Sequence, residues 1–146
     1  MNTEAIMMNS ISNRRKLGAL GEDLFCLLEK CTQSIDPYDS EKDAVDANGK
    51  TVEIKTQARY SYKNMFTIRA KTTNLNKCMK VDRLIFIEFD NTDTIGVFEC
   101  IDRSKFVKYT TSNGTQMVGW SINDNMSQLH SIKDKKLAEW MRFLSV

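Results

Sequence analysis

The spacing of apolar residues changes along the chain, and each spacing predicts a kind of element. Over residues 13–31, leucines recur every three or four positions, which predicts an amphipathic helix. Later segments alternate apolar and polar positions or carry short apolar runs, as strands do. The run Leu84-Ile85-Phe86-Ile87 predicts a strand that is buried on both faces. The predicted strands cover residues 43–47, 50–56, 65–71, 81–89 and 94–101.

The last third of the chain predicts one more strand and two helices. Asp102 is expected to cap a short helix that runs to residue 109, and residues 116–122 form the strand. From residue 131 the tail predicts a helix with one apolar face. That face carries Leu137, Trp140, Met141 and Leu144. The order predicts an α/β (α+β) fold, a mixed β-sheet flanked by helices. No repeat or linker interrupts the chain, so we expect a single domain over residues 1–146.

Composition excludes several classes of protein. The hydrophobic and charged fractions, 41% and 27%, are typical of soluble globular chains, and no apolar run is long enough to cross a bilayer. Residues 1–10 lack the pattern of a signal peptide, so we expect a cytoplasmic protein with no membrane contact. The four cysteines have no C-x-x-C spacing and there is one histidine, so a zinc site lacks its usual ligands.

Charge is divided unevenly along the sequence. Residues 22–46 hold eight acidic residues against two lysines, whereas residues 50–83 hold nine Lys or Arg against two acids. Carboxylates can bind a cation while nearby basic groups meet phosphates, so this division suits a metal-dependent site that acts on a polyanion. A solvated charged surface would give the same composition.

Asn48-Gly49 predicts a hairpin turn between two of the strands, and the type of turn decides which acids face each other. A two-residue turn would bring Asp46 to the face of Glu53. A three-residue turn, with Gly49 in the left-handed conformation, would instead set Asp43 opposite Glu53, with their Cβ atoms about 5 Å apart. We expect the three-residue turn and keep Asp46 as the alternative metal ligand.

Asp43, Glu53 and Lys55 have the residue types needed to cut a phosphodiester. Two carboxylates can bind Mg²⁺, which neutralises the phosphate and acidifies a bound water, and a lysine beside them can orient or deprotonate that water. Glu53 and Lys55 share one face of their strand because side chains alternate. The bare motif often arises by chance, and the alternative interpretation is that Glu53 and Lys55 form the solvated face of an antiparallel strand.

In this context the segment Asp43-Ala-Val-Asp-Ala-Asn-Gly-Lys-Thr-Val-Glu-Ile-Lys55 resembles the PD-(D/E)xK nuclease superfamily and, more narrowly, PvuII-type restriction endonucleases. A weaker similarity of pattern runs from about residue 17 to about residue 120. The resemblance implies a restriction-endonuclease-like fold with a catalytic hairpin. It also implies that Asp43, Glu53 and the main-chain carbonyl of Ile54 bind Mg²⁺, which Mn²⁺ can replace, and that Lys55 serves the attacking water. Glu22 matches an acidic residue that reaches the metal in some relatives; the alternative is a solvated helical glutamate.

The resemblance assigns base contacts to the strand that follows the hairpin, where Thr67, Arg69 and Lys71 share one face. Relatives carry histidines in this strand, so any DNA sequence that this chain reads should differ. Arginine prefers the acceptors of guanine, which makes Arg69 the candidate for a base contact, and contact with a phosphate is the alternative. Lys63 and Lys77 are expected to contact phosphates or to be plain surface charge.

These residues predict a Mg²⁺-dependent endodeoxyribonuclease whose partner is DNA. It is expected to be sequence- or site-specific, and the resemblance implies that it leaves 5′-phosphate and 3′-hydroxyl ends. The PvuII type dimerises through a longer N-terminal segment, so this chain is expected either to nick one strand as a monomer or to cut both as a weak homodimer. Restriction, a mobile element or interference between elements could use such an enzyme. The alternative is a non-catalytic DNA-binding protein that retains the nuclease fold.

Overall fold

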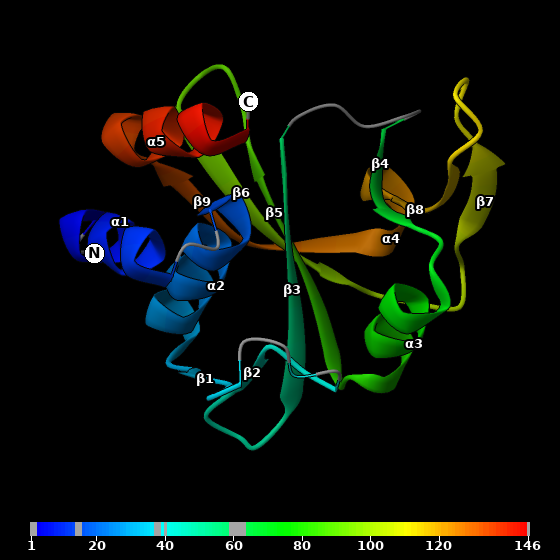
Figure 1. Cartoon of the computed structure of the whole chain (residues 1–146), viewed down its shortest axis with the longest axis horizontal. Helices are drawn as coiled ribbons and strands as arrows, with labels where there is room; N and C mark the ends of the chain where they lie inside the picture. The colour runs from blue at the N-terminus through cyan, green and yellow to red at the C-terminus, as the bar shows by residue number, and fades with distance from the viewer. Residues whose placement is uncertain (1–2, 14–15, 37–38, 40, 59–63, 146) are drawn as a thin grey trace.

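Two β-sheets and their covering helices make up the fold (Figure 1). The computed structural model describes residues 3–13, 16–36, 39, 41–58 and 64–145. In chain order its elements are α1 (Thr3–Asn13), α2 (Lys16–Glu29), β1 (Thr32–Gln33), β2 (Ala44–Val45), β3 (Thr51–Ala58), β4 (Met65–Arg69), α3 (Thr72–Lys80), β5 (Arg83–Phe89), β6 (Thr94–Cys100), β7 (Val107–Thr110), β8 (Gln116–Ser121), α4 (Ile122–Asn125), β9 (Met126–Lys133) and α5 (Lys135–Ser145).

The larger sheet is mixed, as predicted, and has the strand order β1-β2-β3-β5-β6-β9. Its strands β3 and β5 run parallel, and all its other neighbours are antiparallel. A parallel pair needs a long crossover connection. Here the crossover contains β4 and α3, which therefore lie beside the strand that carries Glu53 and Lys55.

One face of the large sheet is covered by α1, α2 and α5, on the left in Figure 1. Leu20 and Leu24 of α2 pack there with Ile54 of β3 and with Leu137 of α5. Helix α2 approaches β3 closely at Gly21. A Cβ atom built on Gly21 would lie 1.7 Å from Oγ1 of Thr56, so only glycine fits the contact.

The other face of the sheet packs against the smaller sheet, whose order is β4-β8-β7, and against α3. The rings of Phe66 and Phe86 stack with their centroids 4.8 Å apart, and Trp120 lies beside Phe86. Leu84 and Cys78 complete this second cluster. Strand β5 is therefore buried on both faces, as its apolar run predicts.

Most of the predicted strands are confirmed, and so is the apolar face of the C-terminal helix. Strands β4, β5, β6 and β8 fall within residues 65–71, 81–89, 94–101 and 116–122. Leu137 and Met141 are fully buried on α5, and Trp140 and Leu144 are partly buried against the same cluster. Within the described ranges, no helix is long and apolar enough to span a membrane.

The helix predicted over residues 102–109 is wrong. The carboxylate of Asp102 accepts hydrogen bonds from the amide and hydroxyl of Ser104, which makes a turn, and Asn125 binds the carbonyls of Asp102 and Lys105. The chain then continues as β7, because Val107–Thr110 pairs with β8. Side-chain bonds from a distant residue fix a turn where the local pattern favoured a helix cap.

Besides β7, the short elements β1 and α4 and three longer ones were not predicted. Residues 126–133 form β9, an edge strand whose register shifts opposite Val97 and Phe98, so its apolar residues do not keep a period of two. His130 lies in this strand. Helices α1 and α3 were also missed. Helix α3 has Lys71 at its N-cap without a side-chain cap, so the usual start signal is absent.

We expect Gly21→Ala to destabilise the protein by about 1–3 kcal/mol, because the added methyl group overlaps Thr56 across the contact between α2 and β3. Gly18→Ala is the matched control on the same helix. Its Cβ would meet nothing within 4 Å, and alanine should there stabilise the helix by up to about 1 kcal/mol. Urea unfolding of both variants measures the difference, and equal stability would contradict the packing described here.

Candidate active site

The turn between β2 and β3 determines which side chains meet. The amide of Asp46 donates to the carbonyl of Lys50 at 2.9 Å, which leaves three residues in the loop, and Gly49 has φ +79°. Ala44 pairs with Val52, and the amide of Asp43 bonds to the carbonyl of Val52. The predicted three-residue turn is confirmed, and it sets Asp43 beside the strand position of Glu53.

The Asp43 carboxylate ends the ladder between β2 and β3. Its Oδ2 accepts a hydrogen bond of 2.8 Å from the amide of Ile54. The N–H and C=O of one strand residue point to the same edge, so the carbonyl of Ile54 is directed to the side where Asp43 lies. Two carboxylates and a main-chain carbonyl are thus available at one place.

Glu53 is almost completely buried, with 1% of its surface exposed. Its Oε2 lies 3.0 Å from Nζ of Lys55, and its Oε1 lies 3.2 Å from Nζ of Lys77. Beyond that ion pair, Oε1 has no hydrogen-bond partner among the described residues. The alternative that Glu53 and Lys55 form a solvated strand face is wrong for Glu53.

The electrostatics of the pair follow from burial and proximity. Burial and the adjoining Asp43 carboxylate raise the pKa of Glu53 to about 7. Burial acts in the same direction on Asp43, but hydrogen bonds with Glu53, Lys77 and the Ile54 amide outweigh it and hold the pKa of Asp43 below its usual value. For Lys55 and Lys77, burial favours the neutral amine, yet the two carboxylates outweigh it and raise both lysine pKa values.

Lys77 is the site residue that sequence reasoning misplaced. It was expected at a phosphate or on the surface, whereas its ammonium group lies 2.8 Å from Oδ1 of Asp43 as well as 3.2 Å from Glu53. It reaches them from α3, which Leu75 and Cys78 anchor in the second cluster. No local spacing in the sequence places Lys77 beside the carboxylates, because both of its partners lie on another part of the chain.

Asp46 and Glu22 were the alternative metal ligands, and the structure gives Asp46 other partners. Asp46 accepts hydrogen bonds from the amides of Asn48 and Lys50 and pairs with Arg83 at 3.2 Å, so it stabilises the turn. Glu22 is 5% exposed and is therefore not a solvated glutamate. Its helix, α2, packs on the face of the sheet opposite to Glu53 and Lys55.

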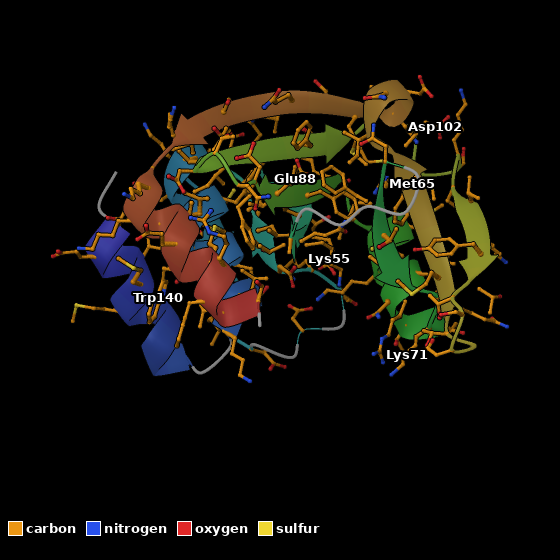
Figure 2. The ribbon with its side chains drawn as sticks, turned by 90° about the horizontal axis from the view of Figure 1, so that it is seen from above. Lys55, Met65, Lys71, Glu88, Asp102 and Trp140 are labelled. Carbon is orange, nitrogen blue, oxygen red and sulfur yellow. The ribbon has the colours of Figure 1, made fainter. Side chains whose placement is uncertain are left out.

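The predicted DNA contacts occupy the strand next to the site. Thr67 and Arg69 share one face of β4, while Phe66 and Ile68 point into the second cluster. Arg69 and Lys71 are exposed. Figure 2 shows Lys55 between the helical layer that contains Trp140 and the segment of β4 and α3 that contains Lys71. Lys63 lies outside the described residues.

Gln57 joins this strand to β3, which carries Glu53 and Lys55, and sequence reasoning overlooked it. Its Oε1 accepts a hydrogen bond of 3.0 Å from the amide of Thr67. It follows Glu53 and Lys55 on the same face of β3, because side chains alternate. Its Nε2 is buried and has no hydrogen-bond partner in the part of the chain that the structure describes.

Asp43 and Glu53 fit a hard divalent cation. Their carboxylates meet, Oε1 of Glu53 has no hydrogen bond, and a lysine ammonium already bridges the two groups. A position that accepts a positive charge between oxygens is suited to Mg²⁺ or Mn²⁺. Among the described residues, no three His, Cys, Asp or Glu side chains form a metal cluster, so the Ile54 carbonyl and water would complete the shell.

Comparison with known proteins adds no assignment. Neither the models of protein families nor the curated proteins that were searched give a match to this chain. The interpretation of the site therefore depends on its geometry and on the residues that form it.

We expect the free energy of unfolding of Glu53→Gln, relative to that of the unaltered protein, to be higher at pH 8 than at pH 5. Both proteins are measured without divalent cations. A carboxyl whose pKa rises on folding to about 7 favours folding when protonated, and this contribution is lost as pH rises from about 4.5 through 7. Glutamine imitates the protonated form. Thermal unfolding at several pH values measures the effect, with the exposed Glu139→Gln as control. A difference that does not change with pH would contradict the assigned electrostatics.

Proposed function

We propose that the chain is a metal-dependent DNA endonuclease of the PD-(D/E)xK type, with a restriction-endonuclease-like fold. The observation that carries the proposal is the contact between Asp43, the buried Glu53 and Lys55 around one hairpin. Burying two touching carboxylates is unfavourable, since two unit charges about 4 Å apart repel by about 4 kcal/mol at an effective dielectric of about 20. Such a pair is retained where it serves chemistry, and a cation site is the use that fits best.

Asp43, Glu53 and the carbonyl of Ile54 would hold Mg²⁺, or Mn²⁺ in its place. The ion, when bound, neutralises charge on the scissile phosphate and lowers the pKa of a water molecule. The chain itself would supply the rest. Lys55 lies 3.0 Å from Glu53, so its ammonium group is held where it can orient the attacking water and meet charge that develops on the phosphate.

Hydrolysis forms one bond and breaks another. The water oxygen joins phosphorus, the bond from phosphorus to the 3′ oxygen breaks, and the proton that water loses is balanced by the proton that the 3′ oxygen gains. The products are a 5′-phosphate and a 3′-hydroxyl. This chemistry needs cations that approach a polyanion, in agreement with the basic side chains along residues 50–83.

The strand β4 is proposed to meet DNA through Thr67, Arg69 and Lys71. Arg69 is exposed at the end of β4, and Lys71 precedes α3. The hydrogen bond from Thr67 to Gln57 fixes β4 relative to the catalytic strand. A strand held in this way can present Arg69 to a groove of the DNA at a fixed distance from the carboxylates. We keep sequence- or site-specific cutting as the proposal, by a monomer that nicks or by a weak homodimer that cuts both strands.

We expect the protein to convert supercoiled plasmid in Mg²⁺ to relaxed circles if it nicks, or to linear and banded products if it acts as a dimer. Glu53→Gln and Lys55→Met should each lower the rate by at least about 100-fold, because they remove a cation ligand and a water-orienting charge. EDTA should stop the reaction, and Glu139→Gln should cut at the normal rate. Cutting by Glu53→Gln at the normal rate would contradict the assignment of the active site. Plasmid that is bound but never cut would favour the non-catalytic DNA-binding protein.

We expect Arg69→Ala to lose about 1–3 kcal/mol of discrimination between the preferred DNA site and others, while affinity for unrelated DNA changes little. Lys71→Ala is the comparison. Loss of a phosphate contact should weaken binding to all sequences and lower the number of counterions released on binding by about one, measured from the salt dependence of the affinity. Binding curves on selected and random duplexes measure both effects. If Arg69→Ala weakens all duplexes equally, Arg69 is a phosphate contact.

A further inference from the structure

The ammonium group of Lys77 lies between the two carboxylates that would bind a divalent cation. Its ammonium nitrogen lies 2.8 Å from Asp43 and 3.2 Å from Glu53, and it contacts one oxygen of each carboxylate. Lys55 contacts only the other oxygen of Glu53. Lys77 is thus the cation that bridges the acidic pair, and it uses oxygen atoms that a metal ion would also use.

An ammonium group and a divalent cation cannot share these two oxygens. Each would desolvate the same carboxylates, and the two positive charges would repel at short range in a buried site. Once a metal binds, the acidic pair no longer needs the lysine, because the ion supplies the counter-charge. Lys77 must therefore leave the pair when the metal enters.

The surroundings of Lys77 let the side chain leave while its helix stays. Leu75 and Cys78 hold α3 in the second cluster, and Arg103 donates hydrogen bonds to the carbonyls of Cys78 and Val81 at the end of the helix. The Lys77 stem has four flexible carbons, so its ammonium group can move by several ångströms without a change in the backbone. A released ammonium group beside a metal and a phosphodiester has one obvious partner, a phosphate oxygen.

We propose that Lys77 neutralises Asp43 and Glu53 in the absence of metal and is released from them when a divalent cation binds, so that its ammonium group becomes a phosphate contact for DNA. This rests on the proposed nuclease function. Lys77 is then a positioning residue that couples metal binding to DNA binding. The protein would avoid an unpaired acidic site that repels DNA before the metal arrives.

The test measures the chemical reactivity of Lys77 in the unaltered protein, by brief acetylation and mass spectrometry in EDTA and in Ca²⁺. Lys80 is the internal control, since it lies in the same helix and is exposed. In EDTA, Lys77 should react about tenfold more slowly than Lys80, because ion pairing keeps its amine protonated. Ca²⁺ should bring the two rates within about threefold of each other. Calorimetry with Ca²⁺ on the same sample, and on Asp43→Asn, reports whether the ion binds at this pair.

The variants give a second measurement that does not depend on cleavage. Lys77→Met should bind Ca²⁺ about tenfold more tightly, because a competing cation is gone. It should weaken binding of a mixed-sequence duplex about tenfold more in Ca²⁺ than in EDTA, where the loss comes only from the unpaired carboxylates. Lys80→Met, which removes the same charge from the same helix, should show neither the tighter Ca²⁺ binding nor this dependence on metal.

The outcomes separate this proposal from the function on which it rests. If Ca²⁺ binds at Asp43 and the reactivity of Lys77 stays low, Lys77 is a fixed ion-pair partner, and the proposal is overturned while the nuclease assignment stands. Duplex binding by Lys77→Met that falls equally with and without Ca²⁺ would also overturn it. If calorimetry detects no binding of Ca²⁺ or Mg²⁺, the metal site and the proposal fail together.

Discussion

Two carboxylates that touch inside a protein need positive charge at close range, and this requirement organises the centre of the molecule. Asp43 and Glu53 are brought together by the short turn at Gly49, which sets the register of the two strands. Lys55 neutralises one side of Glu53 from within the same strand. The second cation, Lys77, comes from a helix in the crossover between β3 and β5, so the path of the chain and the charge balance of the site depend on each other.

The parts of the fold that the sequence predicts are those set by local chemistry. Asn48-Gly49 and the adjoining alternation predict the hairpin and its register, and the run from Leu84 to Ile87 predicts the central strand. The turn at Asp102 could not be predicted, because Asn125 fixes it from a distant part of the chain. For the same reason the position of Lys77 was missed. Its partners lie 34 and 24 residues away, counted as 77 − 43 and 77 − 53, and no local spacing encodes them.

The pattern of apolar residues in β4 predicts a strand of the single mixed sheet, yet β4 pairs with β8 in a separate sheet. Its other edge has a side chain in place of a neighbouring strand, since Gln57 accepts from the amide of Thr67. Packing of Phe66 on Phe86 holds the two sheets face to face. One side-chain hydrogen bond and one apolar contact thereby hold β4, which carries the exposed Arg69, against β3 and β5.

The distance along the chain between partners also has a consequence for folding. A hairpin with three loop residues closes at low entropic cost, so Asp43 and Glu53 can meet early, whereas Lys77 arrives only when the long crossover between β3 and β5 has closed. Until then the carboxylates oppose the structure that brings them together. Closure of α3 onto the sheet removes this opposition, so the charges favour that step of assembly. Any event that detaches α3 from the folded protein would restore the repulsion and would weaken the hairpin with it.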